Sequence, residues 1–359
     1  MTFLFIRAVF LTIFTQNNFL LGTFRMYTRY YKWGIFVLIL LLLLFVVVVA
    51  GLCVGEINYS PGEVLRILFG EGDDVRAEIL RKLRLPRVLL GFIVGGSLSL
   101  AGAILQGIFK NPLVEPYTLG ISGGASVAVA IVVVFSLETV LGVLTLPFSG
   151  FLGALITIVF IYMVAMKGRS VRIQTLLLSG VMISFIASSA MMLLMSVARS
   201  DKLHGVIFWI MGGLNETNIN LIVFLCILSM LVLLLSCGYA PALNAMRLGV
   251  ERATQLGVNA ERSVKVLFLL SSLLTGMCVA VAGVIGFVGL IIPQLIRYVV
   301  GTDFRILLVS SFLGGGIFLI LCDIFARVVI SPNELPIGVV TGIIGGILFI
   351  VVMMKKRGE

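Results

Sequence analysis

The chain has 359 residues, of which 60% are hydrophobic and 12% are charged, and its formal net charge is +10. This composition and a mean hydropathy of +1.20 exclude an ordinary soluble domain. The cations lie scattered over short loops and form no stripe, which argues against a nucleic-acid-binding protein. We therefore expect an all-α polytopic membrane protein.

The first segment of the chain is compatible with several interpretations. Residues 1–24 are apolar apart from Arg7, and no convincing cleavage site precedes Met26. Such a segment fits an interfacial helix, a weak signal-like sequence, or upstream sequence from a start codon assigned too early. We expect residues 1–33 to form a cytoplasmic or interfacial segment and residues 34–359 to form the transmembrane domain.

Ten apolar stretches follow, most of them close to the roughly 20 residues that a membrane-spanning helix needs. They lie near residues 34–54, 88–109, 117–137, 147–166, 173–198, 219–238, 266–284, 286–300, 306–325 and 336–354. The eighth stretch is short for a crossing, so the distribution of charge provides an independent test of the number.

The charged residues favour ten spans. With a cytoplasmic N-terminus, 17 of the 26 Lys and Arg residues lie inside and nine outside, whereas five of the 16 acidic residues lie inside and 11 outside. Fusing the seventh and eighth spans gives 13 cations on each side, which removes the positive-inside bias. The sequence therefore predicts ten transmembrane helices, with both termini in the cytoplasm.

The first long polar interruption, residues 55–87, lies outside in this topology. Ser60 and Pro61 predict the start of a short helix, because serine is a favoured N-cap and proline is tolerated at the first helical position. Arg84 and Arg87 lie where this segment enters the second span. They could anchor lipid headgroups, or form a basic rim that meets acidic residues of an external partner.

Polar residues and prolines interrupt the chain between the second and third spans. Residues 106–116 contain Gln106, Lys110, Asn111, Pro112, Glu115 and Pro116. Lipid tolerates irregular polar backbone only where protein buries it or water reaches it. Membrane transporters place pathways and gates at broken spans of this kind, so transport is the first functional hypothesis. Gln106, Asn111 and Pro112 are the candidate pathway or gate residues here.

A short internal sequence repeat relates the two halves of the chain. The motif Ala-Gly-x-Ile begins at residue 101 before Pro112, and it begins again at residue 282 before Pro293 with the same spacing. Five spans separate the two copies. An odd number of crossings inverts the second copy relative to the first, which predicts inverted-repeat halves. Pro293 therefore joins the pathway or gate candidates.

Trp209 follows the fifth span on the outer side, where it is either an interfacial anchor or part of a pathway vestibule.

The longest inner loop, residues 239–265, predicts two short helices around Gly249 and Gly257, because glycine is the expected C-cap. Apolar residues at helical spacing favour a docking platform over a linker. The alternative is an amphipathic loop that lies on the headgroups.

Two further features concern charge and metal binding. Asp323 and Arg327 lie four residues apart near the outer end of the ninth span. Such a pair is either functional or a local ion pair one helical turn apart. All five cysteines lie within or at the ends of apolar spans, no CxxC motif occurs, and His204 is the only histidine. We therefore expect no protein-built metal site.

Several motifs, in order along the chain, resemble those of the FecCD/BtuC permeases, the membrane subunits of ABC importers for ferric siderophores, haem and cobalamin. The resemblance runs from about residue 56 to the C-terminus. The matching motifs are Arg84-Leu-Pro-Arg87, Ala101-Gly102 with Gln106, Lys110-Asn111-Pro112 with Glu115-Pro116, Leu119-Gly120, Trp209-x-x-Gly212, Leu248-Gly249-x-Glu251-x-Ala253-x-x-Leu256-Gly257, Gly286-Phe-x-Gly289 with Pro293, Asp323-x-x-Ala326-Arg327 and Glu334-Leu-Pro-Ile-Gly338. The chain departs from the family at position 294, which is Gln where many relatives carry His.

The resemblance implies a type II ABC importer permease that pairs with a second copy, as a homodimer, around a central pathway. It implies that the inner loop contacts a cytoplasmic ABC ATPase through Leu248, Gly249, Arg252, Ala253, Leu256 and Gly257. It also implies that an external substrate-binding protein docks on Arg84, Arg87 and Arg327.

By the same resemblance, the chain moves an iron chelate, a siderophore or haem, into the cytoplasm by ATP-driven alternating access. No Gly-x-x-x-x-Gly-Lys-Ser/Thr motif occurs, so we expect no enzymatic activity and no cofactor on this chain, with ATP and magnesium bound by two separate ATPase chains. Cobalamin is the alternative substrate. An ion-coupled secondary transporter and a membrane scaffold are the rival classes, although the former needs ionisable residues deep in its spans. We expect the cytoplasmic (inner) membrane of a prokaryote as the location, with membrane lipid and no nucleic acid as partners.

Overall fold

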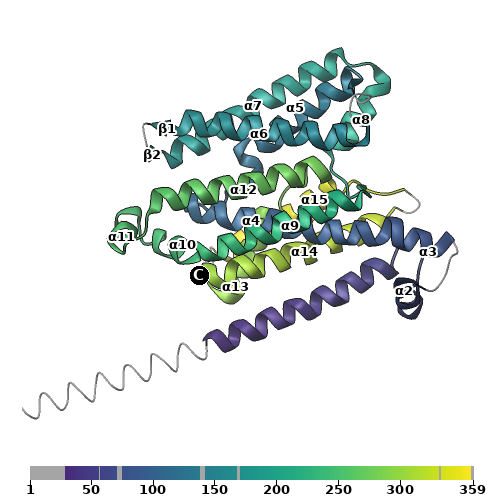
Figure 1. Cartoon of the computed structure of the whole chain (residues 1–359), viewed down its shortest axis with the longest axis horizontal. Helices are drawn as coiled ribbons and strands as arrows, with labels where there is room; N and C mark the ends of the chain where they lie inside the picture. Colours follow the sequence, from purple (N-terminus) through teal and green to yellow (C-terminus); the bar gives the residue numbers. More distant parts are fainter. Residues whose placement is uncertain are drawn as a thin grey trace, which may run out of the picture. The chain divides into compact units, whose positions relative to one another are not determined.

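The computed structural model describes residues 29–55, 57–70, 75–137, 142–167, 170–330 and 333–356 (Figure 1). The chain divides into two units, Met1–Leu42 and Leu43–Glu359. In the first unit the described part is the beginning of a helix that runs over Arg29–Cys53. Most of the predicted N-terminal segment 1–33 lies outside the described residues.

The described residues of the second unit are mainly helical. Two-residue strands, β1 (Met166–Lys167) and β2 (Ser170–Val171), form one short antiparallel pair. The helices are α2 (Pro61–Leu68), α3 (Val75–Ile79), the π-helical η1 (Leu80–Arg84), α4 (Leu85–Phe109), the 3₁₀ turn η2 (Pro116–Leu119), α5 (Ile121–Val134), the 3₁₀ turn η4 (Gly142–Leu144), α6 (Thr145–Ala165), α7 (Ile173–Val197), α8 (Ser200–Ile210), α9 (Ile219–Gly238), α10 (Ala240–Met246), α11 (Val250–Gln255), α12 (Ala260–Ala282), α13 (Val288–Val300), α14 (Phe304–Val328) and α15 (Ile337–Lys356).

The described helices account for the ten predicted spans. Seven are long and apolar enough to cross a membrane: Arg29–Cys53, Val75–Phe109, Thr145–Ala165, Ile173–Val197, Ile219–Gly238, Ala260–Ala282 and Phe304–Val328. Three shorter apolar helices complete the set: Ile121–Val134, Val288–Val300 and Ile337–Val352. The all-α, ten-helix prediction is confirmed. Its third span, predicted near 117–137, begins later than expected because a 3₁₀ turn and Gly120, with a φ of +72°, precede the helix.

Local sequence explains where helix α2 starts. The Ser60 hydroxyl accepts a hydrogen bond from the backbone N–H of Glu63, and the Glu63 side chain accepts one from the backbone N–H of Ser60. This reciprocal cap satisfies two donors at the start of α2 that would otherwise lack partners. The predicted N-cap is therefore confirmed.

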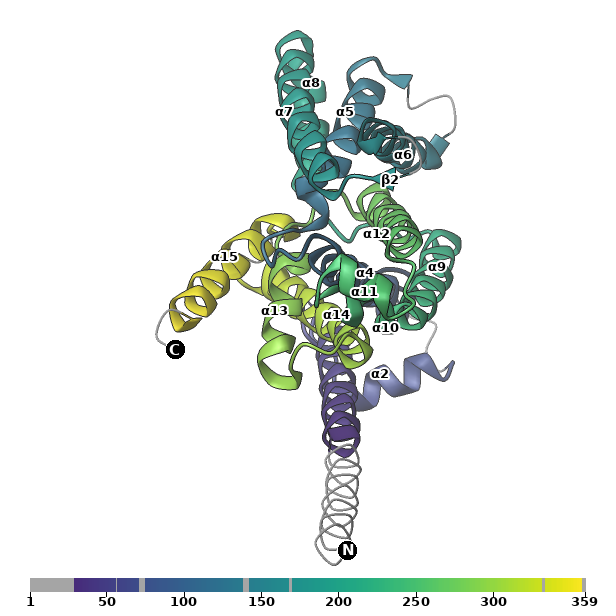
Figure 2. The same cartoon turned by 90° about the vertical axis from the view of Figure 1, so that its left-hand side faces the viewer.

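Helix α4 is at the centre of the second unit. It packs against α9, α12, α13 and α14, and 20 of its residues are buried. Helices α5, α6 and α7 pack against one another, and α12 contacts both groups (Figures 1 and 2). Gly95 of α4 and Gly315 of α14 lie backbone to backbone, so that a Cβ on either residue would overlap the other helix. Small residues therefore permit a close contact between these two helices.

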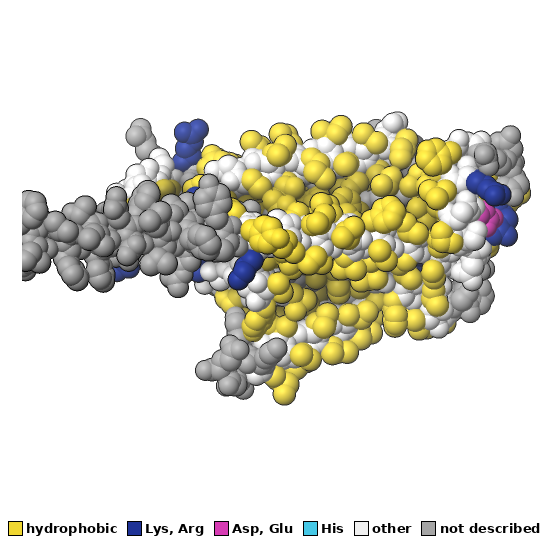
Figure 3. Space-filling model, turned by 90° about the horizontal axis from the view of Figure 1, so that it is seen from below, with side chains coloured by type: hydrophobic (Ala, Val, Ile, Leu, Met, Phe, Trp, Pro, Cys, Tyr) yellow, Lys and Arg dark blue, Asp and Glu magenta, His cyan; other side chains and the backbone are white. Residues whose placement is uncertain are grey.

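Hydrophobic side chains cover most of the described surface seen in Figure 3, and charged side chains lie near its ends. Helices α6, α7 and α9 carry many exposed apolar side chains, among them Ile156, Phe185 and Leu234. An apolar surface of this extent is typical of contact with lipid or with other membrane subunits.

Candidate functional site

The loop 239–265, predicted to be inside, folds into a compact platform that contains α10 and α11, which confirms the two short helices predicted there. Gly249 and Gly257 adopt positive φ values, +121° and +81°, that favour glycine over other residues. The backbone N–H of Gly257 donates to the Thr254 carbonyl, and that of Val258 donates to the Ala253 carbonyl, which closes the end of α11. The local sequence thus fixes both turns of the platform.

The platform exposes apolar side chains. Ala253 is fully buried beneath it, whereas Leu248 is 58% exposed and Leu256 is 65% exposed. Arg252 is also exposed. A folded, exposed apolar surface on a polar loop is typical of a protein–protein contact. The assignment of these residues to ATPase contact stays a prediction.

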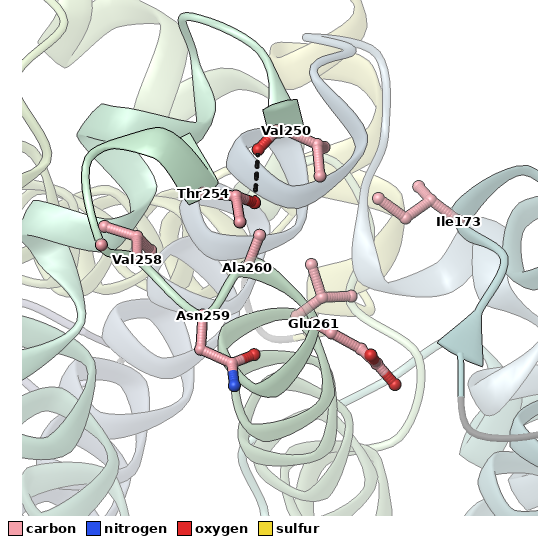
Figure 4. Close-up of a pocket in the computed structure, with 9 residues that line it drawn as sticks. Ile173, Val250, Thr254, Val258, Asn259, Ala260 and Glu261 are labelled. Atoms are coloured by element: carbon pink, nitrogen blue, oxygen red, sulfur yellow. Dashed lines mark hydrogen bonds between the residues drawn. The ribbon is translucent and has the colours of Figure 1, made fainter. Parts of the chain in front are cut away.

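A cavity of 620 Å³ lies beside the platform (Figure 4). Val250 and Thr254 of α11, Asn259 before α12, and Ile173 at the start of α7 contribute to its lining. The Thr254 hydroxyl donates to the Val250 carbonyl at 2.9 Å, which turns this side chain back onto its own helix. The cavity therefore presents a mainly apolar wall, with Glu261 as its acidic lining residue among those described.

The first helix break follows α4. Lys110 has a φ of +50°, which ends the helix, and the Asn111 side chain accepts from the Leu113 backbone N–H at 3.0 Å. Pro112 and Leu113 are exposed. The chain then passes through the turn η2 into α5. The irregular backbone expected at 110–116 is therefore present.

Gln106, near the end of α4, is buried, and its side chain forms hydrogen bonds with the second half of the chain. Its side-chain Nε2 donates to the carbonyls of Gly289 at 3.1 Å and Leu290 at 3.2 Å, both on α13. Pro293 in the same helix has no backbone N–H to give to the Gly289 carbonyl four residues earlier. Gln106 thus supplies the hydrogen bond that Pro293 cannot, and the two predicted candidates belong to one local structure.

The second helix break lies between α12 and α13, and its backbone forms hydrogen bonds with side chains of the first break. The backbone N–H of Phe287 donates to the Glu115 carboxylate at 3.2 Å, and that of Ile285 donates to the Tyr117 hydroxyl at 3.1 Å. Phe287 adopts a φ of +69°, so the chain turns sharply before α13. Glu115 therefore satisfies the backbone donor of the α13 N-cap, and Tyr117 satisfies a backbone donor in the break before it, which lipid could not do.

Two residues of α13 complete the connection between the breaks. Gln294 donates to the Pro112 carbonyl at 2.9 Å, and Arg297 donates to the Gln106 side-chain oxygen at 2.6 Å. The structure therefore brings Gln106, Pro112 and Pro293 together. The roles of Glu115, Tyr117 and Arg297 were not predicted from the sequence, although polar side chains in an apolar chain mark such positions.

Trp209 lies in a different place from the other pathway candidates. It lines a cavity of 580 Å³ together with Arg87, Glu216 and Glu334, at the end predicted to be outside. This location fits either a vestibule or an interfacial anchor. Its role stays a prediction.

The predicted docking arginines differ in their exposure. Arg84 and Arg327 are buried, at 7% and 6% exposed, and both bind carbonyls at the end of helix Arg29–Cys53. Arg84 donates to Leu52 at 3.0 Å and to Ile57, while Arg327 donates to Gly51 and Val54 at 3.1 Å. Arginine side chains commonly satisfy the last carbonyls of a helix in this way. Anchoring of lipid headgroups does not fit a side chain as buried as that of Arg84.

Arg87 is the most accessible member of this arginine group. It bonds the buried carboxylate of Asp323 at 2.8 Å and the half-exposed carboxylate of Glu334 at 2.8 Å. Arg327 pairs with Asp323 at 3.0 Å, so the predicted local ion pair is present and almost completely buried. Within the described ranges, no group of three or more His, Cys, Asp and Glu side chains could hold a metal ion.

Residues 40–355 match the FecCD transport family. The hemin transport system permease protein HmuU of Yersinia pestis is 36% identical over 289 residues, which cover 80% of this chain and 86% of the relative. The vitamin B12 import system permease protein BtuC of Klebsiella pneumoniae is 36% identical over 315 residues, covering 88% and 92%. A solved structure, described as an inward-facing conformation of a metal-chelate type ABC transporter, is 30% identical, has a TM-score of 0.79, and covers 90% of this chain and 99% of its own.

Proposed function

This chain belongs to the FecCD transport family and is a multi-pass permease of ABC importers, and from that premise we propose that it moves an iron chelate, a siderophore or haem, into the cytoplasm. Two separate ATPase chains would bind ATP and drive alternating access of a permease homodimer. An external binding protein would deliver the chelate. The location would be the cytoplasmic membrane of a prokaryote, with both termini inside.

One observation carries the energy-coupling part of this proposal. The inner platform is folded, and it exposes Leu248 and Leu256 beside a cavity of 620 Å³. Because the chain has no phosphate-binding motif of its own, an ATP-driven cycle needs a contact surface for a separate ATPase. The exposed leucines of the platform are suited to that contact.

The helix breaks support a transport pathway. Irregular backbone is tolerated at membrane depth where protein buries it or where it lines a cavity. Here side chains from each half satisfy the backbone groups of the other half, as with Gln106 on Gly289 and Glu115 on Phe287. Discontinuous helices at the interface of inverted repeats are where many transporters bind and pass their substrates.

The substrate assignment rests on relatives and has a specific alternative. One relative is named for hemin and the solved structure for a metal chelate, which favours an iron chelate. The relative named for vitamin B12 is also 36% identical, so cobalamin is the second candidate. Uptake assays would distinguish these substrates. Radiolabelled hemin, a ferric siderophore and cobalamin would be tested one at a time, each with an excess of the other two as unlabelled competitors.

The direct test is reconstitution of this permease with its co-purifying ATPase and external binding protein in vesicles. Uptake of one of the three probes should require ATP and survive an ionophore that collapses ion gradients. Uptake that stops with the ionophore but continues without ATP would overturn the proposal.

A further inference from the structure

The inner platform is joined to the first helix break through the start of α14. We propose that Asn244, Phe304 and Gly107 form a joint that passes movement of the platform to the break at 110–116. This inference rests on the proposed function, because it concerns how ATPase binding at the platform would reach the pathway. None of these three residues contributes to the exposed apolar surface of the platform.

Asn244 fixes platform helix α10 to the N-terminus of α14 with two hydrogen bonds. Its side-chain Nδ2 donates to the Asp303 carboxylate at 2.7 Å, and its Oδ1 accepts from the Phe304 backbone N–H at 3.0 Å. Asp303 is itself the N-cap of α14 and accepts from the Arg305 backbone N–H at 3.1 Å. A displacement of α10 therefore acts directly on the first turn of a long helix.

A third hydrogen bond, from a second side chain, strengthens this connection. Arg247, the residue after α10, donates to the Thr302 carbonyl at 2.8 Å. Two side chains one turn apart on the platform thus hold the short segment between α13 and α14. Because three hydrogen bonds from two side chains fix both position and orientation, α10 and this segment should move as one body.

Phe304 transmits the contact to α4. Its ring is buried and lies on Gly107, where an added Cβ would come within 2.7 Å of the ring carbon Cζ. Leu243 of α10 packs on the same glycine, 3.0 Å from that Cβ position. The ring and the leucine therefore rest directly on the α4 backbone, and no compressible side chain lies between them.

Gly107 is adjacent to Gln106, which connects to the break. Gln106 accepts from Arg297, and Gln294 of the same helix donates to the Pro112 carbonyl at 2.9 Å. The contacts therefore run without interruption from α10 to Phe304, to the end of α4, and to the backbone of the break. A continuous set of contacts permits coupling, but only a measurement of coupling demonstrates it.

The test places a reporter in the break and a nucleotide at the ATPase. Leu113 is 48% exposed, so Leu113→Cys in a background without the five native cysteines gives an accessible thiol. The rate of maleimide labelling is measured in the assembled permease–ATPase complex, without nucleotide and with ATP plus vanadate. We expect the nucleotide to change this rate when Asn244 and Phe304 are intact.

Asn244→Ala and Phe304→Leu should each reduce the nucleotide-dependent change in labelling rate by about 2- to 30-fold, the range expected for residues on a coupling route. Their ATP hydrolysis per complex should stay within about twofold of the unmodified complex. Asn244→Asp keeps the acceptor for Phe304 and loses the donor to Asp303, so it should give an intermediate loss. The double variant should lose less than the product of the two single losses, because the residues act in series.

Asn218→Ala is the matched control. Asn218 caps α9 by accepting from the Asn220 backbone N–H at 3.1 Å, at the end of α9 opposite to the one that leads into α10. This variant loses a helix cap of the same chemistry and should keep the full nucleotide response.

Each outcome decides one question. An unchanged nucleotide response in Asn244→Ala and Phe304→Leu would overturn the joint, and so would failure of both variants to assemble, which would show a purely structural role. If the unmodified permease binds no ATPase, or its break shows no nucleotide response, the proposed function fails instead.

Discussion

The two ends of the molecule use their polar segments in opposite ways. At the inner platform, Leu248 and Leu256 are more than half exposed, although they lie in a charged loop. At the predicted outer end, Asp323 is 1% exposed and Arg84 and Arg327 are nearly as buried. The platform end therefore exposes apolar surface, whereas the end predicted to be outside uses its charges to hold its own helices. Residue type alone would have suggested the reverse.

The largest expected effect is at the end predicted to be outside. Asp323→Ala removes the carboxylate that lies between Arg87 and Arg327 and leaves two cations without a buried partner. Breaking a buried ion pair in this way costs about 3–5 kcal/mol. A thermal unfolding assay in detergent should show a large decrease in the midpoint temperature. Asp201→Ala, which removes an exposed pair with Arg199 at 3.6 Å, should change it little.

At the inner end, Leu256→Asp should prevent a stable complex with the ATPase. An aspartate would place a charge where we expect apolar contact, and disruption of a central interface residue costs about 2–4 kcal/mol of binding free energy. Co-purification and stimulated ATP hydrolysis measure the loss, while the unfolding temperature should stay unchanged. Leu68→Asp, at another exposed leucine on α2, is the control. Full ATPase binding by the Leu256→Asp variant would show that the platform is not part of the ATPase interface.

An intermediate effect is expected where the two helix breaks meet. Glu115→Ala leaves the Phe287 backbone N–H without its acceptor, which costs about 1–3 kcal/mol for a buried donor. Glu115→Gln keeps an oxygen in place and should recover most of the stability. Unfolding midpoints of the two variants measure this difference. Equal midpoints would show that the hydrogen bond does not stabilise the break.

The smallest effect concerns the exposed carboxylate of Glu334. Glu334→Gln should change stability by less than about 1 kcal/mol, because this pair with Arg87 is partly exposed. It also leaves more of the Arg87 charge available, so the external binding protein should bind up to about fivefold more tightly at low salt and equally at high salt. Charge reversal of Arg87 itself is a poorer test because it would also break the bond to Asp323. Glu78→Gln, at the exposed pair with Lys82, is the control, and a gain that persists at high salt would contradict the electrostatic explanation.

The sequence could predict what depends on neighbouring residues. Hydrophobic length and positive charge gave the ten spans, Ser60 and Pro61 gave the start of α2, and Gly249 and Gly257 gave the turns of the platform. Each of these signals acts within a few residues along the chain. They are therefore readable without knowledge of the packed structure.

The sequence could not predict partners that depend on helix rotation and crossing. Gln106 and Gly289 are 183 residues apart, and they meet only because α4 and α13 cross at this point. The inward direction of Arg84 and Arg327 was missed for the same reason, since only the packed structure brings the end of helix Arg29–Cys53 within their reach. A basic residue near a membrane boundary gives no sign of which way its side chain turns.

The hydrogen bond from Gln106 to Gly289 also has a consequence for biogenesis. The ribosome delivers α4 to the membrane long before α13 exists, so the Gln106 amide must first be satisfied by water or by a temporary neighbour. The Gly289 carbonyl, which receives no backbone hydrogen bond from Pro293, can accept from this amide as soon as α13 inserts. The nascent first half should therefore stay hydrated near Gln106 until the eighth span arrives, and the protein should acquire its final compactness late in synthesis.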